Sequence, residues 1–254
     1  SIPTEICLIS GLVHLHLAHN PIHHSIPSHI GNLTRLLDLD LDKMFLTGSL
    51  PTSILAMKHL TRLFVYTNSL TGTIPGLFGY YIDTLIQVDL HQNQFTGPIP
   101  STIGNLTRME HLFLSENIFT GPIPESIIDM SILRILQLST NHLSKSIPTV
   151  VCELKILGYI FLDDNRFTGP IPSNINNLRA LQYLTLTRNC LSGTLPSVIN
   201  TLSVLTKLDV THNRMVGAIP TNVSYTMGSL GLGYNQFTGM YDGVCIYIYI
   251  YIYS

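Results

Sequence analysis

The sequence predicts an α/β-type repeat solenoid, in which about ten short copies of one unit stack into a single coil. Three observations predict it. A leucine-x-leucine-x-x-asparagine phrase returns at a nearly fixed interval, apolar and variable residues alternate just before each anchor, and a proline lies seven residues after nine of the ten anchors. One such copy cannot bury its own leucines, so neighbouring copies must share a core. The anchors are Asn20, Met44, Asn68, Asn93, Asn117, Asn141, Asn165, Asn189, Asn213 and Asn235.

The interval between anchors is 24 residues, as from Asn117 to Asn141. One residue is inserted near Gly79 to Ile82, and two are lost near Ser224 to Met227. We assign residues 1–243 to one repeat domain of about ten 24-residue copies plus a partial first one. Neither end carries a visible cap, so we expect the chain to be an internal piece of something longer.

Each copy predicts a strand followed by a turn. Alternation over 14–18 places the leucines on one face of a half-buried strand, and stacked copies form a parallel sheet. The following proline cannot donate a ladder hydrogen bond, so the chain leaves the sheet there. Each asparagine can bond backbone groups that would otherwise be unpaired, which Met44 cannot do, so we expect a weak joint at Met44. A glycine suits the next bend, with His24 and Lys145 as departures.

Composition excludes several classes of protein. Lys plus Arg number 13 and Asp plus Glu number 15, giving a net charge of −2, which argues against a nucleic-acid partner. Hydrophobic residues make up 45% of the chain, without an apolar run long enough for a spanning helix. The four cysteines form neither a disulfide framework nor a C-x-x-C zinc pair.

The unit from Leu90 to Pro100, continued by Ile103-Gly104-Asn105-Leu106, resembles the plant-type leucine-rich-repeat (LRR) family. The resemblance covers residues 1 to about 243. It implies a right-handed superhelix with a parallel inner β-sheet, a short second sheet and a 3-10 or irregular outer side. Members of this kind are mostly ectodomains of receptor-like kinases and receptor-like proteins, or cell-wall proteins similar to polygalacturonase inhibitors. Fold alone does not decide between these functions.

Residues 244–254 form a low-complexity tail in which isoleucine and tyrosine alternate. Translation of an AT dinucleotide tract produces this alternation, so we interpret the tail as read-through into non-coding sequence rather than native structure. The alternatives are an edge strand that caps the solenoid and a membrane segment, although the tail is too short to span a bilayer.

The solvent side of the inner sheet is the predicted ligand-binding face, because the leucines are committed to the core. Aromatic side chains among charged ones make an apolar strip with a polar rim, which is typical of a protein or peptide interface. The alternative is that aromatic residues pack well on any sheet surface. The candidate residues are Arg62, Phe64, Tyr66, Asp89, Phe113, Tyr159, Phe161, Asp163 and Tyr183.

The first two copies contain a weak candidate for a metal site. His14 and His16 lie beside Asp38 and Asp40 on the neighbouring strand, so imidazoles and carboxylates could meet at a divalent ion. The favoured alternative is an ordinary cross-strand charge pairing. We therefore expect no metal or other cofactor. No nucleophile elbow, H-E-x-x-H motif or P-loop is present, so we expect no enzyme.

Two further patterns recur on the coil. A Ser or Thr recurs at one position in eight of the ten copies, as at Thr96 and Thr120, and could match an ice lattice, although the family consensus already places a hydroxyl there. Glycosylation sequons begin at Asn32, Asn105 and Asn222, with chance as the alternative.

We predict a non-catalytic protein- or peptide-recognition domain of a cell-surface, receptor-like protein or kinase in signalling or defence. It would be an extracellular glycoprotein, attached to the membrane only through a segment missing from this chain. The alternatives are a secreted inhibitor of a cell-wall polysaccharide hydrolase and a truncated fragment without independent function.

Overall fold

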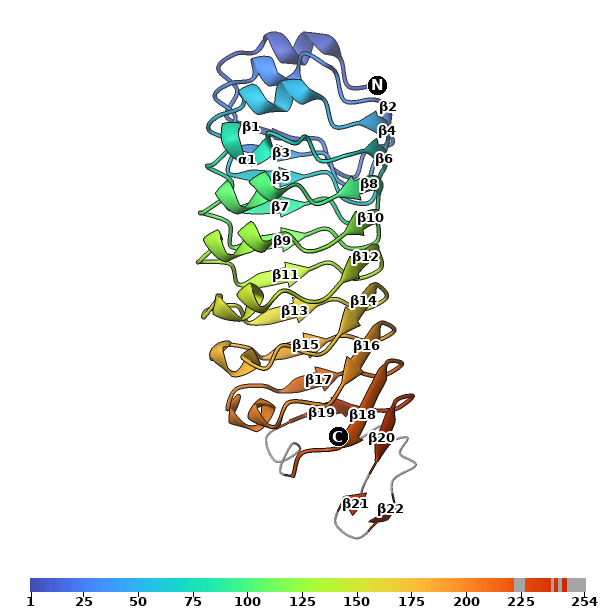
Figure 1. Ribbon diagram of the computed structural model, residues 1–254. Helices are drawn as coiled ribbons and strands as arrows, with labels where there is room; N and C mark the ends of the chain where they lie inside the picture. Colours follow the sequence, from blue (N-terminus) through green and yellow to red (C-terminus); the bar gives the residue numbers. More distant parts are fainter. Residues whose placement is uncertain (222–226, 239, 242–243, 246–254) are drawn as a thin grey trace.

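The computed structural model describes residues 1–221, 227–238, 240–241 and 244–245. Its coils stack into one elongated column with the N-terminus at one end and the C-terminus at the other (Figure 1). Each coil contributes one strand to an inner sheet and one to a second sheet, and each strand between the first and the last of its sheet pairs with those of the coils before and after it. The predicted solenoid is therefore confirmed.

The inner sheet has ten parallel strands of three residues each. Equivalent positions of successive coils lie opposite one another, as do Leu112 and Leu136, so the repeat sets the register directly. The middle residue of most of these strands is buried between two residues that face solvent. The strands are β1 (His14–His16), β3 (Asp38–Asp40), β5 (Arg62–Phe64), β7 (Gln87–Asp89), β9 (His111–Phe113), β11 (Ile135–Gln137), β13 (Tyr159–Phe161), β15 (Tyr183–Thr185), β17 (Lys207–Asp209) and β19 (Ser229–Gly231).

The second sheet also has ten parallel strands, but its register is offset. Thr96 lies opposite Ile118 and Thr168 opposite Cys190, two residues before the equivalent threonine or serine of the next coil. In Figure 1 the arrows of β16 and β18 accordingly run obliquely to the inner strands. The strands are β2 (His23–His24), β4 (Phe45–Ser49), β6 (Ser69–Gly72), β8 (Gln94–Pro98), β10 (Ile118–Gly121), β12 (His142–Lys145), β14 (Arg166–Gly169), β16 (Cys190–Gly193), β18 (Arg214–Ala218) and β20 (Gln236–Thr238).

Short helical turns return the chain from the second sheet to the inner sheet. A prolyl step precedes most of them, with Pro100 and Pro148 in extended conformation just before the turn. The inserted residue is accommodated where one α-turn, α1 (Phe78–Tyr81), replaces the 3-10 turn, which confirms the predicted place of the insertion. The 3-10 turns are η1 (Thr4–Leu8), η2 (Ile30–Asn32), η3 (Thr52–Ala56), η4 (Ser101–Asn105), η5 (Glu125–Asp129), η6 (Thr149–Glu153), η7 (Ile175–Asn177) and η8 (Ser197–Thr201).

The C-terminal end of the described chain lies outside both sheets. Strands β21 (Met240–Tyr241) and β22 (Val244–Cys245) form a separate antiparallel pair. The rest of the predicted Ile-Tyr tail, 246–254, lies outside the described residues, and so does most of the region where two residues are lost.

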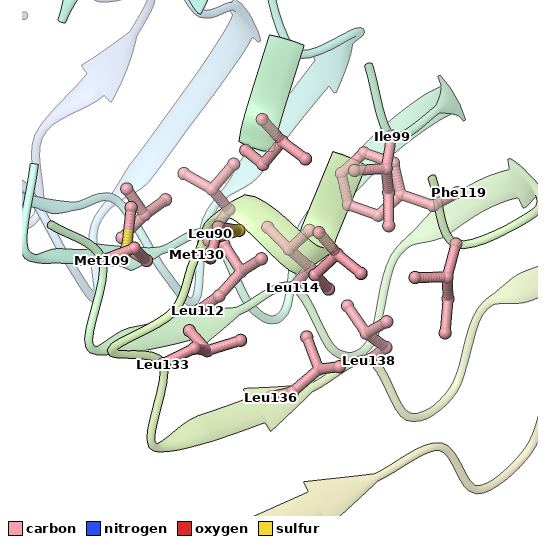
Figure 2. Packing of buried hydrophobic residues seen from close by; sticks show 14 of the residues in the cluster. Leu90, Ile99, Met109, Leu112, Leu114, Phe119, Met130, Leu133, Leu136 and Leu138 are labelled. Carbon is pink, nitrogen blue, oxygen red and sulfur yellow. The ribbon is translucent and has the colours of Figure 1, made fainter. Parts of the chain in front are cut away.

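The core is one continuous cluster that runs the length of the column. Figure 2 shows how one coil contributes to it: Leu112 of the inner strand and Leu114 just after it point inward with Phe119 of the second sheet. Phe119 is fully buried, and its ring stacks on Phe95 of the previous coil with centroids 6.2 Å apart. The core is thus built in layers that touch only their neighbours, as expected for a solenoid.

The anchor asparagines join successive coils by hydrogen bonds in the interior. The side-chain amide of Asn141 donates to the carbonyls of Leu114, in the previous coil, and Leu138, in its own, at 3.0 and 3.1 Å. Its Oδ1 accepts the backbone N–H of Phe119 at 2.9 Å. Asn141 is 5% exposed, so it pairs backbone groups that water does not reach.

Met44 interrupts this series, as the sequence predicts. An asparagine at position 44 would accept a hydrogen bond from the N–H of Ile22. With methionine there, this N–H donates to the carbonyl of Asn20, in its own coil, at 2.7 Å. Met44 is 4% exposed and fills the space with apolar atoms. The joint between the first two coils therefore lacks the interior amide bridge.

The last or next-to-last residue of the second-sheet strands β2 to β18 has the left-handed backbone conformation. Gly169 has φ of 75°, while His24 and Lys145, the predicted departures, have φ of 75° and 72°. A side chain in this region costs roughly 1–2 kcal/mol. A Cβ on Gly169 would meet only the Cβ of Ser146 at 3.6 Å, so the backbone angle alone opposes substitution there.

Exchanging asparagine and methionine at the anchors tests the amide series. Asn141→Met would leave the Phe119 N–H buried without a partner and would remove one hydrogen bond each from the Leu114 and Leu138 carbonyls, so we expect the free energy of unfolding to fall by about 3 kcal/mol. Met44→Asn supplies the missing bridge and is expected to raise it. Urea denaturation followed by far-UV circular dichroism measures both, and equal effects of the two changes would contradict the assignment.

Lys145→Gly is expected to stabilise the protein by about 1 kcal/mol, because glycine removes the steric cost of the left-handed conformation. Gly169→Ala, in the next coil, should destabilise it by a similar amount. The thermal unfolding temperature checks both. A fall in that temperature for Lys145→Gly would show that the Lys145 side chain makes a compensating contact.

Candidate functional site

The solvent face of the inner sheet carries an aromatic cluster at β13 and β15. The rings of Tyr159 and Tyr183 lie edge to face with centroids 5.2 Å apart, and Phe161 lies 6.5 Å from each of them. Tyr183 is 37% exposed, and Tyr159 and Phe161 are half-buried. Register explains the contact, because Tyr159 lies directly opposite Tyr183. These three predicted residues therefore form one surface, which we call the aromatic cluster.

Asp163 closes one side of the aromatic cluster. Its carboxylate accepts hydrogen bonds from the Thr185 hydroxyl at 2.5 Å and from the Thr187 N–H at 2.9 Å. Beyond it, Asp164 and Arg188 of the next coil form a bidentate ion pair. The aromatic cluster therefore has a polar border held rigid by cross-strand hydrogen bonds.

A second group of predicted residues lies nearer the N-terminus. Tyr66 stacks on His91 with centroids 4.5 Å apart, and the Lys43 ammonium lies 5.7 Å from the Tyr66 ring. The pKa of Tyr66 is raised well above its usual range, chiefly because its hydroxyl donates a hydrogen bond to Asp42 and secondly because the side chain is partly buried. Asp89 is 8% exposed and lies 2.5 Å from His91. Asp89 was expected on the solvent face, but its neighbours cover it and it acts as a structural partner of His91.

The remaining predicted ligand-binding residues do not join these groups into one cluster. Phe113 contacts His111 on β9 at a centroid distance of 6.0 Å, and Phe64 is half-buried on β5 opposite Asp89. Four strand spacings separate β5 from β13, about 19 Å at about 4.8 Å each. The predicted strip is thus two groups on one face, with Phe113 between them.

A chain of hydrogen-bonded polar side chains ties the first three coils together. His14, Asp38 and Arg62 occupy the same position of successive inner strands. The Asp38 carboxylate lies 2.5 Å from His14 Nδ1 and accepts Nε and Nη2 of Arg62 at 2.5 and 2.8 Å. Arg62 was predicted as a ligand-binding residue, but its guanidinium is engaged here. Arg62 and Asp38 are 24 residues apart, one repeat, so the sequence already placed them side by side on neighbouring strands and could have predicted the contact.

Of the four residues in the weak metal candidate, three come together. Atoms of His14, His16 and Asp38 that can bind a metal lie within 4.8 Å of one another. Asp40 is not in this group, and its Oδ1 accepts the backbone N–H of Asp42 at 3.3 Å. Asp42 is 3% exposed, and its Oδ1 has no hydrogen-bond partner among the described residues.

Asp38 and Asp40 have opposite pKa shifts. The hydrogen bond from Arg62 chiefly, together with the one from His14, lowers the pKa of Asp38 to about 2. Burial first, and then the charge of Asp42, raises the pKa of Asp40. The folded state therefore favours the ionised form of Asp38 and the protonated form of Asp40.

The other predicted surfaces lie elsewhere on the coil. Asn32 is exposed on η2 and Asn105 is half-buried on η4, away from the inner strands, while Asn222 lies outside the described residues. A groove of about 760 Å³, which the sequence analysis missed, lies along the prolyl segments between Glu125 and Val198. The thiols of Cys7 and Cys152 are buried and free, and burial raises the pKa of Cys152 to about 12.

Comparison with known proteins identifies the coil. Leucine rich repeat models match residues 153–215, and also residues 11–33 and 84–106. Receptor-like protein 41 of Arabidopsis thaliana is 34% identical over 116 residues, which are 44% of this chain and 13% of that protein. The chain is a plant-type LRR protein.

Solved structures share this LRR coil over nearly its whole length. The plant peptide hormone receptor RGFR1 in complex with RGF2 is 30% identical, with a TM-score of 0.79, covering 93% of this chain and 42% of the receptor. A plant ice-binding protein is 26% identical, with a TM-score of 0.80, covering 94% of this chain and 77% of that one. No helix among the described residues is long and apolar enough to cross a membrane.

Exchanging each of the two aspartates for asparagine tests the opposite shifts. Because the pKa of Asp38 is lower folded than unfolded, its contribution is complete above about pH 4 and is lost as the pH falls toward 2. We expect Asp38→Asn to cost about 2 kcal/mol at pH 7 and almost nothing near pH 2.

Because the pKa of Asp40 is higher in the folded than in the unfolded chain, Asp40 makes the fold less stable as the pH rises and the carboxyl ionises. Asparagine does not ionise, so Asp40→Asn should raise the thermal unfolding temperature at pH 7. Thermal unfolding between pH 2 and 7 measures both variants. Parallel pH profiles for the two would contradict the assignment.

Proposed function

We propose that the inner sheet of this LRR protein binds a peptide or protein ligand through the aromatic cluster, within a cell-surface receptor-like protein in signalling or defence. The observation that carries the proposal is the contact of Tyr159, Phe161 and Tyr183 on the solvent side of a rigid sheet. Tyrosine and phenylalanine are enriched at interfaces because they bury large apolar area at little conformational cost.

The surroundings of the aromatic cluster support a binding role over simple packing. Its rings are only partly covered by their neighbours, and Tyr183 is 37% exposed. The polar border formed by Asp163 and the Asp164–Arg188 pair is already ordered, so little freedom is lost when a ligand binds. An apolar centre with a polar rim is the usual composition of an interface.

The relatives point the same way. Receptor-like proteins are among those similar in sequence, and a similar solved coil is a peptide hormone receptor described in complex with RGF2. The chain matches less than half of either protein, so the anchor and any signalling domain of a whole receptor are part of the proposal. Extracellular exposure would also place Asn32 where it can be glycosylated.

Ice binding is a second candidate, suggested by the similar coil of a plant ice-binding protein and by the exposed threonines of the second sheet. We place it second, because the offset register puts His142 beside Thr120 and Arg214 beside Ser192. Bulky and charged neighbours interrupt the flat row of hydroxyls that a lattice match requires. Ice-recrystallisation inhibition by the purified chain would favour this candidate.

Peptides selected from a random phage-displayed library against the 254-residue chain provide a direct test. We expect the triple variant Tyr159→Ala/Phe161→Ala/Tyr183→Ala to weaken their binding at least 30-fold, because buried aromatic anchors dominate interface energies. Biolayer interferometry measures the affinities.

A matched control removes three exposed aromatic residues from other surfaces, as Phe45→Ala/Tyr80→Ala/Tyr81→Ala. It should leave the affinities unchanged. Selected peptides that bind the aromatic-cluster variant as tightly as the unchanged chain would overturn the proposal. Inhibition of a cell-wall polysaccharide hydrolase would favour the inhibitor alternative.

A further inference from the structure

Two histidines of the first inner strand present their imidazoles on the same face. His14 and His16 flank the buried Leu15 on β1, and both side chains are exposed. Their ring centroids are 6.2 Å apart and the ring planes are inclined by 81°. A His-x-His pair on a strand therefore offers two nitrogen ligands from a rigid backbone, since alternate residues share one side.

The hydrogen bond to Asp38 determines which nitrogen of His14 is free. Asp38 is held by Arg62 and is ionised, so its carboxylate can only accept, and His14 Nδ1 must carry the proton that it donates. His14 Nε2 is then the nitrogen with the lone pair, on a side chain that is 56% exposed. A carboxylate behind an imidazole fixes the orientation of metal-binding histidines and increases their basicity.

We propose that His14 Nε2 and His16 chelate a divalent transition-metal ion, with Asp38 as the carboxylate that orients His14. Potential ligand atoms of these three residues already lie within 4.8 Å of one another. With His14 held by Asp38, rotation of the exposed His16 imidazole would let one nitrogen of each ring lie roughly 2.0–2.1 Å from the same ion, the distance that zinc requires. Water fills the remaining coordination positions, because the site is open to solvent.

The ligand chemistry selects the class of metal. Two imidazoles suit Zn²⁺, Cu²⁺ and Ni²⁺, whereas Ca²⁺ and Mg²⁺ require sets of oxygen ligands. Asp38 is unavailable as a direct ligand, because Arg62 and His14 already occupy both of its oxygens. Asp40 lies opposite His16 in register and adds a second carboxyl group beside the two imidazoles. The site is thus a two-histidine chelate with a carboxylate behind it.

Isothermal titration calorimetry of the 254-residue chain with ZnCl₂, NiCl₂ and CuCl₂, in buffer without chelators, tests this site. We expect saturable binding whose His-dependent component is one ion per chain. His14→Ala and His16→Ala should each weaken it at least tenfold. Asp38→Asn should weaken it about 10-fold to 100-fold while both imidazoles remain. Electron paramagnetic resonance of the Cu²⁺ complex should show hyperfine coupling to imidazole nitrogen that the double variant His14→Ala/His16→Ala lacks.

The matched control is His23→Ala/His24→Ala, which removes two exposed adjacent histidines of β2. It should bind metal like the unchanged chain. The proposal is overturned if the unchanged chain binds no metal, if the His14/His16 double variant binds as tightly, or if the control loses binding. An unaltered affinity in Asp38→Asn would remove Asp38 from the site. His16→Ala leaves the contacts of Asp38 intact, so it decides the question even if Asp38→Asn unfolds.

Discussion

The amide ladder in the interior is the interaction on which the rest of the structure depends. A coil of short strands and turns leaves backbone donors and acceptors between its layers, and water cannot reach them. Asn141 and its equivalents pair these groups within and between coils. Each asparagine thus joins one leucine layer to the next, and the inner face becomes a rigid platform for side chains.

The rigid stacking of the coils explains how residues far apart in the sequence form binding surfaces. Positions one repeat apart become direct neighbours, so Tyr159 meets Tyr183 and Asp38 meets both His14 and Arg62. A ligand that covers the aromatic cluster meets side chains that are already ordered, which lowers the entropic cost of binding. The same regularity lets one strand present two imidazoles side by side. Both proposals therefore use the inner sheet, at positions several coils apart.

Much of the fold could be predicted from the sequence, because its period sets the inner register and its prolines mark the turns. The left-handed bends at His24 and Lys145 and the defect at Met44 were also predictable from their place in the repeat. The offset of the second sheet was not, since it depends on how the strands incline. The burial of Asp89 and the ion pair of Arg62 with Asp38 were also not predicted, because they depend on side-chain contacts that the repeat period does not specify.

The hydrogen-bonded series of His14, Asp38 and Arg62 has a consequence for how the column unfolds. In a solenoid, each layer is held only by its neighbours, so a junction with fewer interior bonds is a place where neighbouring layers separate more easily. Met44 makes such a junction, between the first and second coils. Asp38, in the second coil, hydrogen-bonds His14 in the first coil and Arg62 in the third. Hydrogen bonds on the inner face thus link the first two coils where the interior amide bridge is missing.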